Sequence, residues 1–486
     1  MLFNSYTFVC LFLPVTLVAY ALLSRLHHRR TSIAWLVAAS LFYYGWWEPR
    51  YLLLLLPSTL FNYGSGIAID QLQTDRGKRA LLIVGITANL ALLGYFKYFN
   101  FFVNTINAVA DTQFSTSSIV LPLAISFFTF QQIAYLVDVY TGRADEYSLV
   151  DYSLFVCFFP QLIAGPIVHH AEMLPQFTRR AYRFDDGDFA VGATMFTIGL
   201  FKKVVIADTL ATFASPVFGT AETGSSPSFW LAWQAALAYT GQLYFDFSGY
   251  SDMAIGAARL FGIKLPLNFN SPYKARNIID FWRRWHMTLS RFLRDYLYVP
   301  LGGNRRGRPR RYVNLMITMV LGGLWHGAGW TFVFWGFLHG LYLCVNHGYR
   351  ALVRDHHWAR AESRLVSALY TGITLICVVV AWVFFRAESF AGALRVLEGM
   401  CDVTRLAGTT PDVRAWSWVS AALALALFAP NSQEILSQYE PALGVKPTTQ
   451  ALTWKPNAPW ALVTAAVALY GLLHISRASE FIYYQF

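Results

Sequence analysis

The sequence predicts an all-α integral membrane protein that crosses the bilayer many times. Of its 486 residues, 56% are hydrophobic and only 13% are charged, whereas a soluble domain is typically about 45–50% apolar and about 25% charged. The mean hydropathy is +0.41. Many stretches reach the roughly 20 apolar residues that a helix needs to span a bilayer. This excess of apolar residues is too large for a single buried core.

Charge and cysteine content narrow the class further. The chain carries 38 Lys and Arg against 27 Asp and Glu, a net charge of +11. Lys and Arg gather in the cytoplasmic loops of membrane proteins, which accounts for the excess. Nucleic-acid binding would require a basic face with a recognisable binding motif, and the sequence contains none. The five cysteines form no CxxC pair, so we predict neither a disulfide framework nor a metal site.

The apolar stretches predict one membrane domain, residues 1–486, with about 11–12 spans. The apolar start is followed by a basic cluster at residues 25–30. This order indicates a first span with its N-terminus outside rather than a cleaved signal peptide. The candidate spans are residues 6–23, 33–47, 51–69, 79–99, 120–140, 189–207, 229–247, 312–326, 330–347, 365–385, 416–429 and 459–475.

Loop charges predict the orientation of these spans. Basic connections, expected in the cytoplasm, alternate with connections that lack Lys and Arg, such as residues 100–118 and 215–228. The alternation requires residues 149–168 to enter and leave on one side. Because this stretch holds Pro160, Gly165 and Pro166, we predict a re-entrant segment with broken backbone. The longest basic region, residues 249–311, is predicted to be cytoplasmic or interfacial.

Within this basic region, residues 277–299 predict one amphipathic helix. Apolar residues recur every three or four positions, from Ile278 to Tyr296. A basic helix of this kind is typical of a membrane interface. His286 lies at the edge of the apolar face, so its ring is expected to point into the protein or the membrane. The alternative role for this histidine is one hydrogen bond to a backbone carbonyl.

His326 lies inside a long apolar run, residues 312–344, and is flanked by glycines. Ionisable residues within a span usually face the bundle interior or an aqueous cavity. A neutral histidine there is suited to act as a general base for a hydroxyl. A structural histidine and a proton relay in a transporter are the alternatives. For His339 we favour a packing role.

Three acidic residues also fall in apolar stretches, namely Asp138, Asp208 and Asp246. We expect each to pair with an arginine or to cap a broken helix. No serine or cysteine has an evident activating partner, so a covalent acyl-enzyme on this chain is not predicted.

Four ordered strings stand out in the sequence: residues 244–256 (YFDFSGYSDMAIG), 281–290 (FWRRWHMTLS), 293–304 (LRDYLYVPLGGN) and 322–327 (GGLWHG). They resemble the membrane-bound O-acyltransferase (MBOAT) family, specifically the bacterial branch that acetylates alginate or transfers D-alanine to teichoic acid. The end of the chain, residues 479–486 (SEFIYYQF), looks like the alginate-acetylating subgroup. The resemblance covers almost the whole chain.

The resemblance implies a helical ring around a central tunnel, with His326 as the central catalytic residue and His286 as the second polar residue. Trp325 and Asp246 are then expected to line the tunnel. The implied donor is a cytoplasmic acyl thioester, with acetyl-CoA as the co-substrate. Guanidinium groups pair well with phosphate oxygens, but they also bind anionic lipid. These two ligands remain open for the four arginines near His286, which are Arg283, Arg284, Arg291 and Arg294.

The implied setting is the inner membrane of a bacterium, with a periplasmic N-terminus. The acceptor is an exported polysaccharide such as alginate. We favour transfer through a periplasmic partner with an SGNH-type fold, working with the polysaccharide export machinery. The alternatives are D-alanyl or other acyl transfer to teichoic acid, peptidoglycan or cellulose, a proton-coupled transporter, and a non-catalytic scaffold.

Overall fold

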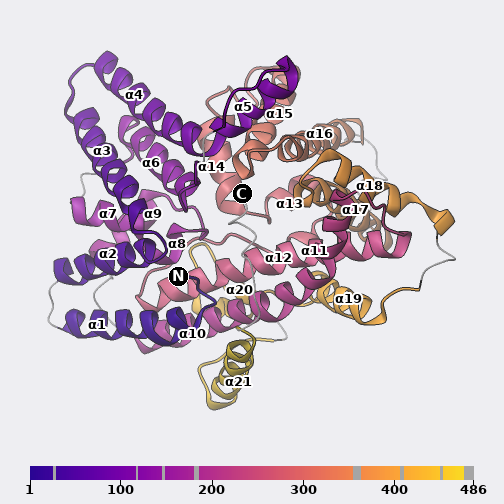
Figure 1. Cartoon of the computed structure of the whole chain (residues 1–486). Coiled ribbons are helices and arrows are strands. Elements are labelled where there is room, and N and C mark those ends of the chain that lie inside the picture. Colours follow the sequence, from indigo (N-terminus) through magenta and orange to yellow (C-terminus); the bar gives the residue numbers. More distant parts are fainter. Residues whose placement is uncertain are drawn as a thin grey trace.

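In a computed structural model the protein is built of helices, and no strand occurs in the part of the chain that the structure describes (Figure 1). The described residues are 1–25, 29–116, 119–144, 148–179, 185–353, 363–405, 410–448 and 452–475. The predicted all-α class is therefore confirmed. The C-terminal string at residues 479–486 lies outside the described residues, as do parts of the basic connections at 25–30, 177–188 and 350–364.

The N-terminal part is a set of helices on one side of the molecule, drawn in indigo and violet in Figure 1. A π-helical turn joins α4 to α5, so that residues 75–110 form one continuous helical stretch. The elements are η1 (Thr7–Phe12), α1 (Leu13–Arg25), α2 (Arg29–Gly45), η2 (Pro49–Tyr51), α3 (Leu52–Gln71), α4 (Asp75–Leu93), η3 (Gly94–Tyr98), α5 (Phe99–Ala110) and α6 (Ile125–Tyr140).

The predicted re-entrant segment has the broken backbone that its prolines and glycine indicated. Two short helices, α7 (Leu149–Cys157) and α8 (Phe159–Leu162), lead through a turn to α9 (His170–Arg179). Pro160 lies in the first turn of α8, where its missing N–H costs nothing. Nearly every residue from 151 to 168 is buried. On which side of the membrane the segment opens stays a prediction.

A long central helix, α12 (Phe229–Leu260), organises the rest of the fold. α10 (Asp186–Phe201) packs along it and continues through η4 (Lys202–Ala207) into α11 (Asp208–Glu222). Glycines allow the close approach: a Cβ on Gly199 would lie 2.5 Å from the carbonyl oxygen of Gly249. α12 is buried to its end, so residues 249–260 are interior helix, and the cytoplasmic or interfacial placement of residues 249–311 stays a prediction.

The remaining elements form the segment that carries both histidines and a C-terminal group of helices. α15 and α16 pack closely, because Gly323 and Gly336 face the partner helix where a Cβ would meet its backbone. The elements are η5 (Pro272–Lys274), α13 (Ile278–Trp282), α14 (Met287–Leu293), η6 (Arg294–Tyr298), α15 (Gly307–His326), α16 (Trp330–Val353), α17 (Arg364–Arg386), α18 (Phe390–Cys401), η8 (Val403–Arg405), α19 (Val413–Phe428), α20 (Ser432–Ile435), η9 (Ser437–Tyr439) and α21 (Ala458–His474).

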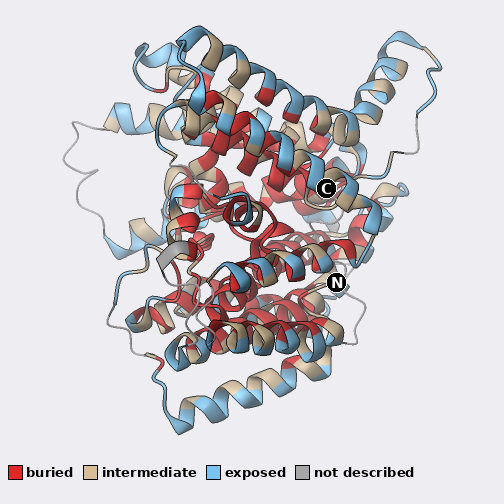
Figure 2. Ribbon diagram, turned by 90° about the vertical axis from the view of Figure 1, so that its left-hand side faces the viewer, coloured by how far each residue is buried: buried red, intermediate tan, exposed pale blue. Residues whose placement is uncertain are grey.

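The outer surface has the character of a lipid-facing protein. Buried residues gather along the middle of the molecule, while the outward faces of the peripheral helices are exposed (Figure 2). Large apolar side chains stand on those faces, such as Leu53 at 77% and Leu365 at 80% exposure. A soluble protein rarely exposes so much apolar surface to water, whereas such a surface is favourable in contact with lipid chains.

Five helical stretches among the described residues are long and apolar enough to cross a membrane. The protein is therefore a multi-pass membrane protein, and the full count of about 11–12 spans remains a prediction. The five stretches are Thr7–Arg25, Pro49–Gln71, Asp75–Ala110, Asp186–Glu222 and Arg364–Arg386.

Candidate active site

The fold brings His286 and His326 together, although they are 40 positions apart in the sequence. Their ring centroids are 6.2 Å apart. His326 is the last residue of α15, and His286 is the residue immediately before α14. Both are buried: His326 is 4% exposed and His286 is 0% exposed. The predicted interior position of both side chains agrees with the structure.

The prediction of one continuous helix over residues 277–299 is wrong. The chain leaves α13 at Trp282, passes through turns, and starts α14 at Met287. His286 has a left-handed backbone with φ +42°, which is uncommon for a residue with a side chain. Hydrogen bonds to residues 268–270 replace the helical ones: the Met287 amide donates to the Asn268 carbonyl, and the Asn270 amide donates to the Arg284 carbonyl. This tertiary pairing turns the His286 ring inward.

Asn268 fixes the proton on the His286 ring. Its Oδ1 lies 2.9 Å from His286 Nδ1 and also accepts from Thr288 Oγ1 at 2.9 Å. The Thr288 hydroxyl accepts from the Ile167 amide at 3.0 Å, so its own proton points to Asn268. An amide oxygen only accepts, and His286 Nδ1 must therefore carry its proton. Nε2 is left as an acceptor without a hydrogen-bond partner in the part of the chain that the structure describes.

Aromatic rings pack around His326, which is 4% exposed. Trp335 of α16 and Phe385 of α17 meet its ring edge-on, with centroids 5.1 and 5.3 Å away. Trp325, predicted to shape the chamber, is 5% exposed, and its ring centroid lies 4.9 Å from that of His326. Trp325 is itself stacked on Phe130 of α6. The arrangement is a buried, aromatic site, and electrostatic interactions are stronger in such surroundings than in water.

His339, for which we favoured packing, is fully buried beside the pair. Trp282 Nε1 donates to its Nδ1 at 3.3 Å, and its ring is stacked with that of Phe281. These contacts belong to the aromatic core that positions α13 against α16.

The three intramembrane acids all have partners in the part of the chain that the structure describes. Asp246 and Asp208 both form ion pairs with Lys203 of η4. Asp138 accepts from the Tyr296 hydroxyl at 2.7 Å and lies 3.2 Å from His170 Nδ1. Asp246 is 1% exposed and joins α12 to η4 through its pair with Lys203, and its predicted place on a tunnel wall stays a prediction.

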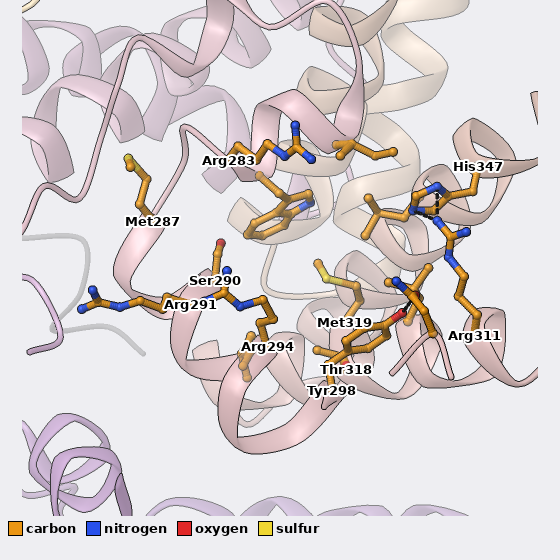
Figure 3. Close-up of a pocket in the computed structure, with 16 residues that line it drawn as sticks. Arg283, Met287, Ser290, Arg291, Arg294, Tyr298, Arg311, Thr318, Met319 and His347 are labelled. Carbon is orange, nitrogen blue, oxygen red and sulfur yellow. Dashed lines mark hydrogen bonds between the residues drawn. The ribbon is translucent and has the colours of Figure 1, made fainter. Parts of the chain in front are cut away.

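A cavity of about 580 Å³ opens beside the histidine segment (Figure 3). Its walls come from the α13–α14 turn, η6, α15 and α16. Neither His286 nor His326 lines the cavity, but Met287, the residue after His286, does. Met319 lies seven residues before His326 on α15, which is about 10 Å along the helix axis. The cavity therefore ends within about two helical turns of the catalytic candidate.

The cavity is basic. Four arginines line it, Arg283, Arg291, Arg294 and Arg311, and no Asp or Glu is among its described lining residues. Arg311 and His347 meet on the wall away from Arg291 (Figure 3), with Arg311 Nη2 2.8 Å from His347 Nε2. Such a surface suits an anionic ligand.

The four predicted arginines differ in their partners. Arg291 is held by both carboxylate oxygens of Glu172, and Arg294 is paired with Asp295. Arg284 pairs with Asp280 and does not line the cavity, so the structure separates it from the other three. Arg283 has no ion-pair partner among the described residues, and the same holds for Arg311, which the sequence did not single out.

Two further residues near the pair were missed from the sequence. Asn268 is one of many amides in a loop, and nothing in the pattern marked it. Lys97 did carry a signal, because it is the only charged residue between Arg79 and Asp111, and an ionisable residue in a span is a functional candidate by default. Its Nζ lies 2.5 Å from the Trp325 carbonyl oxygen and 3.3 Å from that of His326.

Comparison with known proteins shows the class. The sequence model of the MBOAT, membrane-bound O-acyltransferase family, matches residues 141–364, which include both histidines. The chain belongs to this family, and it is an enzyme that transfers acyl groups to oxygen.

Curated relatives share most of the chain. The peptidoglycan O-acetyltransferase of Helicobacter pylori is 48% identical over 82% of this chain and 80% of its own length. The probable alginate O-acetylase AlgI of Pseudomonas aeruginosa is 44% identical over 82% of this chain and 75% of its own. The teichoic acid D-alanyltransferase of Streptococcus thermophilus is 27% identical over 57% of this chain. The predicted resemblance is thus confirmed.

Proposed function

We propose that this enzyme transfers an acetyl group from acetyl-CoA, bound on the cytoplasmic side, towards an exported polysaccharide. The observation that carries the proposal is the buried His286–His326 pair beside a cavity lined by four arginines. An acid–base residue, a dry chamber and a basic pocket for an anionic donor are the parts that acyl transfer from a charged thioester requires.

His326 is the general base in this proposal. It takes the proton of the acceptor hydroxyl as that oxygen attacks the thioester carbon. A carbon–oxygen bond forms, the carbon–sulfur bond breaks, and the proton passes from His326 to the leaving thiolate. General-base catalysis is typically worth about 10²–10⁴-fold. The aromatic rings around His326 limit hydrolysis of the thioester by water.

His286 orients the reacting groups. Asn268 holds its Nδ1 proton, so Nε2 accepts a hydrogen bond from the His326 ring or from the acceptor hydroxyl. A neutral histidine in this tautomer does not donate from Nε2. Its role is therefore to align a proton donor rather than to stabilise the oxyanion.

The donor's phosphates bind in the basic cavity. Arg283 and Arg311 are its strongest candidates, because no carboxylate in the described chain neutralises them, while Arg291 and Arg294 already have acidic partners. The thioester then has to reach about 10 Å from the level of Met319 to His326. Anionic lipid headgroups offer the same phosphate chemistry and are the alternative occupant.

The acceptor side rests on the relatives. The names of two of them specify peptidoglycan and alginate as acetylated polymers, and we propose a polymer of this class for the present chain. We further propose that a periplasmic SGNH-type partner of the export machinery carries the acetyl group to the sugar. The enzyme would lie in a bacterial inner membrane with its N-terminus in the periplasm.

The test is CoA release from acetyl-CoA by the purified protein, with and without candidate partners. We expect His326→Ala to abolish release, while His474→Ala, at a half-buried histidine near the end of α21, leaves it unchanged. Equal release by the wild type and His326→Ala would contradict the catalytic assignment. No release by the wild type with any partner would exclude acetyl-CoA, and carrier-protein thioesters and proton-coupled transport would be assayed next.

A further inference from the structure

The end of α15 is held by two side chains from another helix. The last four carbonyls of a helix have no intrahelical partner. Here the Gly323 carbonyl accepts from the Gly327 amide, and the Leu324 carbonyl accepts from the Tyr98 hydroxyl at 3.0 Å. The carbonyls of Trp325 and His326 both accept from Lys97 Nζ. Two adjacent residues therefore complete the end of the helix that carries the catalytic candidate.

Lys97 is placed for this contact by local backbone structure. It lies in η3, a π-helical turn between α4 and α5, and such turns frequently mark functional sites. In Figure 1, α5 lies beside α15, in agreement with the hydrogen bonds. The extra residue in the turn puts Lys97 and Tyr98 on the face towards α15, whereas Tyr95 and Phe99 are exposed on the apolar side.

The charge of Lys97 has no carboxylate beside it in the described chain. Its other contacts are the Ser126 hydroxyl at 3.4 Å and the Trp325 ring, whose centroid is 5.8 Å from Nζ. The end of a helix carries roughly half a negative charge, and ring faces attract cations. The charge is thus balanced by the α15 end and by Trp325, which are both part of the candidate site.

We infer that Lys97 is a positioning residue of the acyl transfer: its ammonium group fixes the carbonyls of Trp325 and His326 and so holds the His326 ring in its catalytic orientation. The inference rests on the proposed function. It assigns Lys97 no contact with the substrate. Loss of the ammonium group should therefore lower kcat and leave the donor KM nearly unchanged.

The experiment compares Lys97→Met with Lys97→Arg in purified protein, using acetyl-CoA turnover. Met keeps the length of the side chain and removes the charge and the donors, whereas Arg keeps both. We expect kcat to fall at least about tenfold in Lys97→Met with a donor KM within about twofold, and Arg to restore part of the rate. Lys274→Met is the matched control, because Lys274 donates to the Ala429 carbonyl at the end of α19, which bears no site residue.

A second pair of variants, Tyr98→Phe and its control Tyr6→Phe, tests the inference if the Lys97→Met protein does not fold. Tyr98→Phe removes the hydroxyl that donates to the Leu324 carbonyl at the end of α15. Tyr6→Phe removes the hydroxyl that donates to the Leu472 carbonyl of α21. We expect a severalfold loss of kcat only in Tyr98→Phe. A wild-type kcat in folded Lys97→Met, or in Tyr98→Phe when Lys97→Met does not fold, overturns the inference.

Hydrogen exchange gives a readout that does not depend on activity. We expect amides in residues 322–328 to exchange faster in Lys97→Met than in the wild type or Lys274→Met. Unchanged exchange there contradicts the positioning role even if no acetyl transfer is found. Conversely, acetyl transfer that depends on His326 but not on Lys97 would leave the proposed function standing and reject this inference alone.

Discussion

Two lysines lie in apolar helices of this protein in similar local structure but with opposite partners. Lys97 belongs to the π-helical turn η3, and Lys203 to the π-helical turn η4. Lys203 is 2% exposed and held between Asp208 and Asp246. Lys97 faces only backbone carbonyls, a hydroxyl and a ring among the described residues.

The difference separates a structural charge from one tied to the site. A buried cation between two carboxylates is neutralised where it stands, and it fastens α12 to the α10–α11 connection. A cation that completes the end of α15 contributes to the geometry of His326. Placing a charge in a membrane span costs free energy at both lysines, but only Lys97 lies beside the proposed reacting groups.

The largest effect should follow removal of the structural charge. Lys203→Met removes the cation that lies between Asp208 and Asp246, and breaking a buried ion pair typically costs about 3–5 kcal/mol. We expect a large drop in the melting temperature of the purified protein in detergent, far beyond that of Lys97→Met. Adding Asp208→Asn and Asp246→Asn should restore most of the stability. Equal melting temperatures for the two lysine variants would remove the contrast between them.

An intermediate effect is expected at the amide that orients His286. Asn268→Ala frees the His286 ring and leaves the Thr288 hydroxyl without its acceptor, at about 1–3 kcal/mol. We expect kcat to fall about tenfold or more. Asn270→Ala is the control, since Asn270 contacts Asn431 and Gln433 rather than a histidine. A similar kcat in both variants would show that the tautomer of His286 does not matter.

The smallest effect is expected in the basic cavity, whose arginines are partly exposed to solvent. Arg283→Ala combined with Arg311→Ala should raise the donor KM by about three- to tenfold with little change in kcat. The wild-type KM should rise with salt, and the double variant should respond less. Arg284→Ala, which lies outside the cavity, should behave as the wild type. A KM that is unchanged in the double variant would assign the cavity to lipid.

The sequence predicted what depends on composition and local pattern. Apolar stretches indicated the helices, and prolines and a glycine indicated the break at residues 149–168. His326 stood out because a titratable residue in an apolar run is rare. His286 was located correctly for a wrong reason, as the edge of a helix that the structure interrupts.

The rest depended on tertiary contacts that no local pattern encodes. The turn at residues 283–286 exists because residues 268–270 supply its hydrogen bonds. The partner of Asp246 is Lys203, 43 positions earlier in the chain, and no local pattern connects the two. Lys97 was the exception, since its isolation in an apolar helix was visible in the sequence and went unused.

The central claim is that His286 and His326 act as one unit, and a double-mutant cycle tests it most directly. The measurement is acetyl-CoA turnover of His286→Ala, His326→Ala and the double variant, each checked for folding. We predict that the double variant loses no more activity than His326→Ala alone, because residues that act as a unit are strongly non-additive. Losses that multiply would contradict the account and assign the two histidines to independent roles.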